Sequence, residues 1–197
     1  MLKVAIVGAT GYTGEELIRL LVGHPKVKIT SLTAKIDKPQ NISEIFPKFS
    51  GKIDLQCANL ESIDDVAADS QVVFLALPHR VSMKFTSRFL QLGRRVIDLS
   101  ADYRLKNTAL YETWYKAVHT SPELVQKAVY GLPELYRTEI KKADLIANPG
   151  CYPTGIILGS APLLKKDFID LSEIIIDAKT GLSGAGRKAD IDRKSVV

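Results

Sequence analysis

The first thirty-odd residues constrain the fold of this chain most. An apolar run over Leu2–Val7, typical of a buried parallel strand, leads into the motif Gly-x-x-Gly-x-x-Gly at residues 8–14. Residues 15–22 continue as an amphipathic helix, and a second apolar segment covers Val27–Leu32. Strand, glycine turn, helix and strand within about thirty residues make one right-handed βαβ unit. The sequence therefore predicts an α/β protein with a doubly wound sheet.

The rest of the chain repeats the alternation of strands and helices. Residues 36–60 are polar and contain proline, which predicts a loop-rich excursion with a short strand near Ile53–Leu55. We expect further strands at 71–77, 95–99 and 145–147, helices at 81–92 and 153–165, and a strand of a second sheet at 173–178. Neither internal repeats nor low-complexity tracts interrupt this pattern.

Composition excludes several classes of protein. With 46% hydrophobic and 25% charged residues, the 197-residue chain is an ordinary globular sequence. Its net charge of +5 comes from scattered Lys and Arg without interleaved aromatic residues, so we expect no nucleic-acid partner; such a balance also suits anionic, phosphorylated ligands. There is no apolar run of about 18 residues and no signal-peptide pattern at the start, so we expect no membrane span and a cytoplasmic protein.

The glycine motif favours dinucleotide binding. Glycines permit the tight turn and let the backbone approach a pyrophosphate, whose negative charge the N-terminus of the following helix stabilises. The candidate pyrophosphate-binding residues are Gly8, Thr10, Gly11, Tyr12, Thr13 and Gly14. The alternative is a glycine turn that packs the helix against the strand and binds nothing.

The end of the second strand indicates which dinucleotide is bound. NAD-binding units place an acidic residue there to hold the ribose 2′-hydroxyl, whereas this chain has no acid before Asp37. Thr33 and Lys35 offer a hydroxyl and a cation, which suit the 2′-phosphate of NADP. Alternatively, Lys35 is a solvated surface lysine.

The two cysteines have different surroundings. Neither Cys57 nor Cys151 has the spacing of a zinc site, and we expect no metal. Cys57 suits a small buried hydrophobe. Cys151 follows Asn-Pro-Gly and precedes Tyr-Pro-Thr, so it should lie at or just before a helix N-terminus, where the helix dipole favours the nucleophilic thiolate. A glycine-flanked cysteine in an NADP-binding chain predicts a thiol-dependent oxidoreductase of aldehydes or acyl phosphates.

Six motifs in order give the chain a family resemblance. They are GATGYTG at 8–14, ALPH at 76–79, DLSADYR at 98–104, YGLPE at 130–134, NPGCYPT at 148–154 and DAKTGLSGAGR at 177–187. From Met1 to about Lys188 the chain resembles the N-acetyl-γ-glutamyl-phosphate reductases, relatives of aspartate-semialdehyde dehydrogenase. The resemblance implies a Rossmann-type NADP-binding domain over residues 1–148 and the start of an α+β catalytic and dimerisation domain over 149–197.

The resemblance also implies roles for single residues. Cys151 would attack an acyl-phosphate substrate and form a thioester, which hydride from NADPH reduces to the semialdehyde. Ser183 and Gly184 would lie near the nicotinamide. Arg104 would bind the substrate phosphate or carboxylate, the alternative being a surface ion pair. His79 would lie near the cofactor, or else cap a helix or pack. Members of the family form dimers or tetramers, so we expect a homo-oligomer.

The chain departs from the family at some points. A histidine expected downstream of the Ser-Gly-Ala-Gly turn is absent, because His24, His79 and His119 all lie upstream. Arg80 occupies a position where the family has a small residue. We also expect the second domain to be incomplete. Two alternatives stay open: a reductase for the aminoadipyl substrate of lysine biosynthesis, one methylene longer, and a truncated NADP-binding module without activity.

Overall fold

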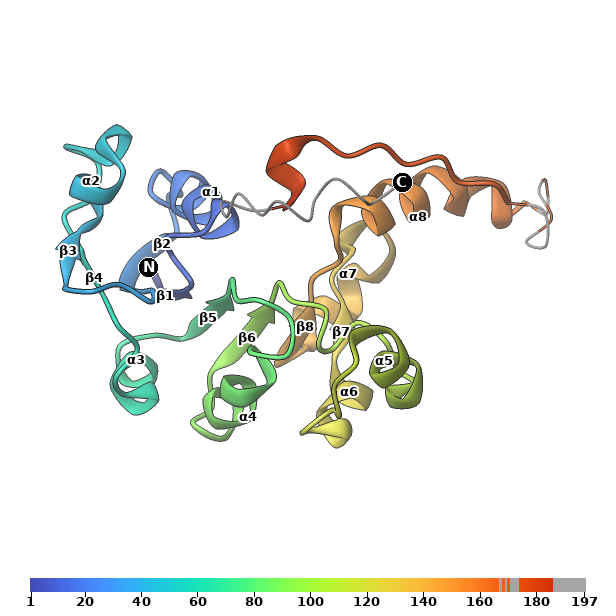
Figure 1. Ribbon diagram of the computed structural model, residues 1–197, viewed down its shortest axis with the longest axis horizontal. Helices are drawn as coiled ribbons and strands as arrows, with labels where there is room; N and C mark the ends of the chain where they lie inside the picture. Colours follow the sequence, from blue (N-terminus) through green and yellow to red (C-terminus); the bar gives the residue numbers. More distant parts are fainter. Residues whose placement is uncertain (167, 169, 171–173, 186–197) are drawn as a thin grey trace. The chain divides into compact units, whose positions relative to one another are not determined.

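The computed structural model describes residues 1–166, 168, 170 and 174–185 (Figure 1). The chain divides into two compact units, Met1–Pro149 and Gly150–Val197.

The first unit is built on one eight-stranded sheet with the order β3-β4-β2-β1-β5-β6-β8-β7. Every neighbouring pair is parallel except β3 and β4. From β1 the chain moves outward to β2 and β4, and then crosses to the other side of β1 to form β5, β6 and β8. This is the predicted doubly wound topology, with its switch point between β1 and β5. The strands are β1 (Leu2–Val7), β2 (Val27–Thr33), β3 (Gln40–Asn41), β4 (Gln56–Ala58), β5 (Val72–Leu75), β6 (Arg95–Asp98), β7 (Val129–Tyr130) and β8 (Leu145–Ala147).

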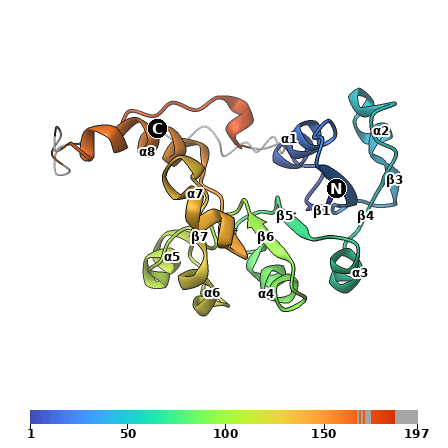
Figure 2. The ribbon, with the colours of Figure 1, turned by 180° about the vertical axis from the view of Figure 1, so that it is seen from behind.

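Helices cover both faces of the sheet, as Figures 1 and 2 show from opposite sides. The helices are α1 (Tyr12–Leu21), α2 (Ile42–Ile45), α3 (Ile63–Ala68), α4 (Met83–Gln91), α5 (Thr108–Tyr115), α6 (Pro122–Lys127) and α7 (Pro133–Lys142), with a 3-10 turn, η1, at Pro47–Phe49. Because successive strand residues point to opposite faces, both faces of a covered strand must be apolar. The all-apolar run of β1 meets this requirement.

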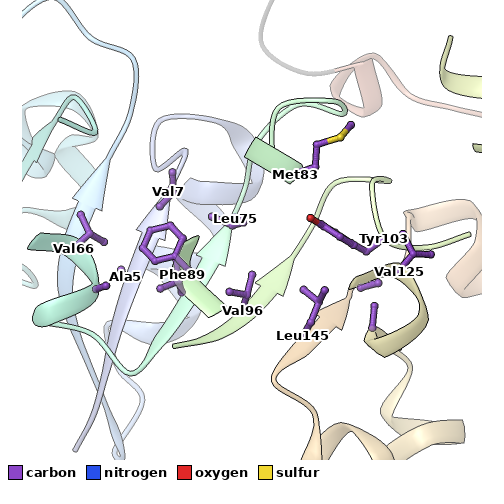
Figure 3. Close-up of a cluster of buried hydrophobic side chains, with 14 of the residues drawn as sticks. Ala5, Val7, Val66, Leu75, Met83, Phe89, Val96, Tyr103, Val125 and Leu145 are labelled. Atoms are coloured by element: carbon purple, nitrogen blue, oxygen red, sulfur yellow. The ribbon is translucent and has the colours of Figure 1, made fainter. Parts of the chain in front are cut away.

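The alternation along β1 separates two hydrophobic cores. Ala5 and Val7 belong to a core formed with α3, α4, α5 and α6, where Phe89 of α4 is fully buried (Figure 3). Val4 and Ile6 face the other way, into a core formed with α1, α2 and η1. The two cores hold the strands in register and so place their carboxyl ends along one edge.

The structure differs from the sequence expectations in the position of β4 and in the elements between residues 108 and 142. The short strand expected near Ile53–Leu55 is present but lies directly after that segment, as β4 at Gln56–Ala58. The Ile53 N–H bonds the Phe49 carbonyl across a turn, so the chain becomes extended only where Cys57 pairs with Leu32 of β2. Between 108 and 142 the structure adds α5, α6, β7 and α7, for which the sequence analysis made no assignment.

Two glycines of the motif are required by close packing. A Cβ on Gly8, whose φ is +95°, would lie 2.2 Å from the Ala76 carbonyl oxygen at the end of β5. A Cβ on Gly14 would lie 2.2 Å from the Gly8 carbonyl oxygen. These backbone approaches press α1 onto β1, and β1 onto β5, at the switch point.

Two buried aspartates organise the loops at the carboxyl ends of β5 and β6. Asp98 and Asp102 have fully buried side chains, and neither has a cationic partner within 4.0 Å among the described residues. Asp98 accepts hydrogen bonds from the Ser82 hydroxyl, from the Ser100 N–H at 3.1 Å and from the Ser100 hydroxyl at 2.7 Å. Buried polar groups of this kind are tolerated only when hydrogen-bonded.

Asp102 ties three segments together. Its carboxylate accepts from the Arg80 N–H at 2.7 Å, from the Met83 N–H at 3.1 Å and from the Tyr111 hydroxyl at 2.8 Å. The loop after β5, the start of α4 and helix α5 are therefore held by one side chain.

The second unit is described mainly through helix α8, Cys151–Leu164, with a 3-10 turn, η3, at Leu182–Ala185. The helix expected at 153–165 is confirmed, although it begins at Cys151. The strand expected at 173–178 is wrong for residues 174–178, which have no strand assignment; Glu173 lies outside the described residues. A β-strand needs a partner for its backbone N–H and C=O groups, and the described part of this unit holds none. No helix in the described ranges has the length and apolarity needed to cross a membrane.

We predict that Gly14→Ala lowers the free energy of unfolding by about 2–3 kcal/mol, because the added methyl meets backbone that cannot move away. The clash outweighs the gain of about 1 kcal/mol that alanine brings to a helix interior. Gly23→Ala is the matched control, since a Cβ there has no neighbour within 4 Å. Urea unfolding measures both; equal stability of the two variants would contradict the packing argument.

We predict that Asp98 makes the protein less stable as pH rises. Burial raises the pKa of Asp98, against the opposing hydrogen bonds from Ser82 and Ser100. The native state then holds the proton more tightly than the unfolded state. The contribution is therefore fully present below about pH 4 and is lost as pH rises through the native pKa.

The variant Asp98→Asn cannot titrate at this position. The free energy of unfolding of the parent minus that of Asp98→Asn should decrease between pH 4 and pH 7, measured by urea unfolding at each pH. Ile97→Val is a destabilised control without a titrating change, and its difference from the parent should stay constant. An increasing difference for Asp98→Asn would show that the hydrogen bonds outweigh burial.

Candidate functional site

The loops that follow the parallel strands of the first unit converge on one edge of the sheet. The glycine loop follows β1, residues 76–82 follow β5, residues 99–104 follow β6, and Asn148-Pro149 follows β8. Ligands of open α/β sheets bind outside the carboxyl ends of the strands, at the switch point. A ligand of this sheet is therefore expected at the loops after β1 and β5.

The glycine loop presents the N-terminus of α1 to this edge. Gly11 is the N-cap of α1, with φ −73° and ψ 166°, and no side chain caps the helix there. The first N–H groups of a helix lack intrahelical acceptors and carry its positive dipole end. A Cβ on Gly11 would meet only the Gly8 carbonyl oxygen, at 3.6 Å, so this face is open. An open helix N-terminus flanked by tightly packed glycines fits a pyrophosphate.

The other residues expected in the glycine loop lie around this opening. Tyr12 and Thr13 have exposed side chains in the first turn of α1, and Thr10 is partly buried. Glu15 brings a carboxylate into the same turn, where Lys48 of η1 forms an ion pair with it. This pairing offsets a charge that would otherwise repel an anion at the helix start.

Strand β2 ends beside the glycine loop. The Thr33 carbonyl accepts the N–H groups of Gly8 at 2.7 Å and Ala9 at 2.9 Å, which fixes the start of the turn. The Thr33 hydroxyl is buried and has no hydrogen-bond partner among the described residues. An unpartnered hydroxyl is unusual in a folded interior and calls for a ligand or water.

A cavity of about 520 Å³ follows β2 and takes in Lys35. It is lined by Lys35, Ile36, Asp37, Lys38 and Gln40. Asn59 holds the loop in place, since it accepts from the Ile36 N–H at 3.2 Å and donates to the Ile36 carbonyl at 2.6 Å. Lys35 is a residue that the sequence predicts here, whereas Lys38, three residues later, lines the same cavity and was not predicted. The three-residue spacing between Lys35 and Lys38 was the sequence feature that could have indicated the second lysine.

A second cavity lies at the opposite edge of the sheet. Its volume is about 430 Å³, and it is lined by Leu90, Leu124, Lys127, Val129, Glu139, Lys142, Ala143, Asp144 and Leu145. Val129 and Leu145 are the first residues of β7 and β8, so this cavity is at the amino ends of the strands. It is therefore separate from the glycine loop.

Arg104 links two of the loops at the carboxyl edge. Its Nε donates to the Asn148 carbonyl and its Nη2 to the Leu99 carbonyl, both at 2.7 Å. No carboxylate lies within 4.0 Å of it in the described part of the chain. The guanidinium thus braces the backbone after β6 and β8. Its expected contact with a substrate anion stays a prediction.

The histidines differ in their surroundings. His79 follows β5 and accepts the Ala101 N–H at its Nδ1, at 3.0 Å. Burial, and then the nearby Arg104 charge, lower the pKa of His79, so the ring is neutral near pH 7. His119 is buried, and both of its ring nitrogens are used within the fold, by the Asp102 carbonyl and the Ser121 N–H. His24 accepts the Lys26 N–H before β2.

The second unit carries the remaining expected residues. Cys151 is exposed and is the first residue of α8, after the N-cap Gly150, where no side chain caps the helix. Ser183 and Gly184 are exposed in η3. Cys57, in contrast, is buried in the first unit, and burial raises the pKa of its thiol to about 11. The buried position expected of Cys57 is thus confirmed. Cys151 lies at a helix start, as the sequence predicts, and its role as nucleophile stays a prediction.

The structure thus groups the glycine loop, Thr33, Lys35, His79 and Arg104 at one edge of the first unit. Cys151, Ser183 and Gly184 belong to the second unit. No cluster of three or more His, Cys, Asp or Glu able to hold a metal occurs within the described ranges.

Comparison with known proteins agrees with this arrangement. The family model described as semialdehyde dehydrogenase, NAD binding domain, matches residues 3–143, and the model described as semialdehyde dehydrogenase, dimerisation domain, matches residues 151–196. The second match extends beyond Lys188, where the motif resemblance ended. A protein of Geotalea daltonii named N-acetyl-gamma-glutamyl-phosphate reductase is 54% identical over 192 residues, which are 98% of this chain and 55% of that protein. The chain thus spans about half the length of the curated relatives it matches.

Solved structures share the fold at low identity. Aspartate semialdehyde dehydrogenase II from Vibrio cholerae matches with a TM-score of 0.60 at 18% identity, over 84% of this chain and 43% of that one. Aspartate semialdehyde dehydrogenase from Candida albicans, solved with NADP, matches with a TM-score of 0.59 at 18% identity, over 86% of this chain and 48% of that one. The first family model alone covers well over half of the chain. The chain therefore belongs to the semialdehyde dehydrogenase family.

Proposed function

We propose that this chain serves the NADPH-dependent reduction of N-acetyl-γ-glutamyl phosphate to N-acetylglutamate semialdehyde, with phosphate released, as a step of arginine biosynthesis. The observation that carries the proposal is the exposed Cys151 at the uncapped N-terminus of α8. Relatives at 49–54% identity that carry the name of this reductase support the choice of substrate.

The proposed cofactor is NADP(H). The open N-terminus of α1 at Gly11 would hold the pyrophosphate, together with Thr10, Tyr12 and Thr13. The hydroxyl of Thr33, the charge of Lys35 and the cavity after β2 would receive the 2′-phosphate. Ser183 and Gly184 would lie near the nicotinamide. When bound, NADPH would supply the hydride.

Cys151 would carry the covalent step. Its thiolate attacks the acyl carbon, a carbon–sulfur bond forms, and the bond from carbon to the phosphate oxygen breaks, so that phosphate leaves with the electron pair. The thioester then accepts a hydride at the same carbon, and the resulting tetrahedral oxyanion re-forms the carbonyl as the carbon–sulfur bond breaks. The products are the aldehyde and the free thiolate. Covalent catalysis divides one difficult step into two easier ones.

The N-terminus of α8 would support both of these steps. Backbone N–H groups at a helix start stabilise the thiolate before attack and can stabilise an oxyanion during it. Arg104 would offer its guanidinium to the substrate phosphate or carboxylate, since its hydrogen bonds to the two backbone carbonyls leave donors of the planar fork for an anion.

The same proposal covers partners and location. The match to a dimerisation domain over residues 151–196 supports a homo-oligomer, a dimer or tetramer, for the whole protein. A nucleophilic cysteine needs a reducing compartment, and the cytoplasm provides one. The binding partner at the site is a small acyl phosphate, with no role for nucleic acid or membrane.

The reaction run in reverse tests the activity. We expect purified chain, N-acetylglutamate semialdehyde, phosphate and NADP to give an increase in absorbance at the NADPH band that requires phosphate. Cys151→Ser should abolish turnover while leaving the NADP dissociation constant within about twofold; Cys57→Ser is the control and should retain turnover. Binding of NADP without any reduction would identify the chain as a cofactor-binding module. Turnover by Cys151→Ser would sink the thioester route.

Alkylation by iodoacetamide tests the thiol itself. At pH 7 we expect Cys151 to react more than 100-fold faster than Cys57, because Cys57 is buried and its pKa is about 11. Exposure alone would also favour Cys151, so the second comparison is Cys151 in the chain unfolded by urea. The folded chain should react several times faster, because only there does the helix terminus favour the thiolate. An equal or slower rate in the folded chain would remove the support for a primed nucleophile.

A further inference from the structure

The turn that follows β5 is strained. Arg80 has a φ of +70°, in the left-handed region that favours glycine. The structure holds it there through Asp102, which accepts the N–H groups of both Arg80 and Met83. Strained residues persist where their surroundings over-determine them, and they cluster at ligand clamps and switch regions. The turn carries the side chain of His79, the residue directly before Arg80.

The ring of His79 is held on two sides. Because Nδ1 accepts the Ala101 N–H, the proton of the neutral ring is on Nε2. Tyr115 contacts the ring edge-on, with centroids 5.3 Å apart, and stacks on Tyr111 at 4.8 Å. Tyr111 in turn donates to Asp102. The same buried carboxylate thus fixes the backbone after His79 and the aromatic residues that support its ring.

The Nε2–H of His79 is a donor that the fold does not use. His79 is exposed overall, although the residues around it partly desolvate its ring, and Nε2 has no hydrogen-bond partner among the described residues. Partial desolvation of the ring, and then the charge of Arg104, lower the pKa of His79, which favours the neutral ring, whose Nε2–H donates without adding a charge. A donor whose tautomer, orientation and charge are all set, yet which lacks an acceptor, is preorganised for a ligand.

The position of His79 indicates which part of a ligand it meets. It follows β5, the first strand of the second half of the sheet, and the glycine turn is directly beside that strand end, where Gly8 approaches the Ala76 carbonyl. In a doubly wound sheet each half accommodates one mononucleotide of the dinucleotide. The half that begins with β1 carries the pyrophosphate loop and the cavity after β2, which leaves the nicotinamide half for the loops after β5 and β6.

We propose that His79 binds the nicotinamide riboside half of the cofactor, with Nε2–H donating to an oxygen of that half. The inference rests on the proposed function only in that the dinucleotide is NADP(H). Asp102 and Tyr115 act through His79 as positioning residues.

Two ligands separate the two halves of the cofactor. NADPH contains both halves, whereas 2′,5′-ADP contains only the adenine half with its 2′-phosphate. We expect His79→Ala in the 197-residue chain to raise the dissociation constant of NADPH about 5- to 10-fold, the usual effect of losing one hydrogen bond, and to leave that of 2′,5′-ADP within twofold. His79→Gln keeps an N–H donor on a side chain of similar reach and should restore part of the NADPH affinity. His24→Ala, a histidine before β2 at the other edge of the sheet, is the control and should change neither constant.

The outcomes distinguish this inference from the proposed function. Loss of 2′,5′-ADP binding by His79→Ala would reveal a general structural effect. Unchanged NADPH affinity of this variant would show that His79 makes no contact with the cofactor. Either result overturns the inference and leaves the proposed function standing. If the parent chain binds neither ligand, the proposed function fails and the inference with it. Isothermal titration calorimetry measures all eight constants, and retained 2′,5′-ADP binding shows that each variant is folded.

Discussion

The carboxylate of Asp102 is the interaction on which the candidate site depends. It is fully buried, has no cationic partner among the described residues, and is stabilised by hydrogen bonds from Arg80, Met83 and Tyr111. Burying a charge in this way is costly unless every acceptor position is used. The segments that supply the donors must therefore stay together, and this requirement places the loop after β5, the start of α4 and helix α5 in one arrangement.

Close backbone contact at the glycine motif constrains the packing of the elements beside the loops that Asp102 holds. Gly8 and Gly14 leave no room for a side chain, so α1, β1 and the end of β5 pack at the minimum distance. The open position is Gly11, at the helix start. The motif therefore combines two physical functions: its outer glycines are needed for packing, and its middle glycine leaves space for a ligand. Membership in the semialdehyde dehydrogenase family agrees with both functions.

Sequence reasoning succeeded where the signal was local. The strands β1, β5 and β8, the helices α1 and α8, and the doubly wound order follow from apolar runs and from glycine and proline at their ends. It placed the short strand near Ile53–Leu55 slightly too early in the chain, because an apolar triplet cannot indicate which residues pair with β2. It also missed Lys38, and it treated Arg104 only as a ligand-binding or surface residue, although the side chain braces two backbone carbonyls.

The sequence by itself determined the fold class, the glycine loop and the location of a cysteine at a helix start. These depend on hydrophobic periodicity and on backbone conformations that only glycine or proline favours, and both are properties of neighbouring residues. Only the tertiary structure decided which polar side chains are used by the fold and which are left for a ligand. Asp98 and Asp102 serve the interior, whereas the Thr33 hydroxyl and Nε2 of His79 have no partner in the described part of the chain. Burial and hydrogen-bond partners come from residues distant in the sequence, and therefore no local pattern encodes them.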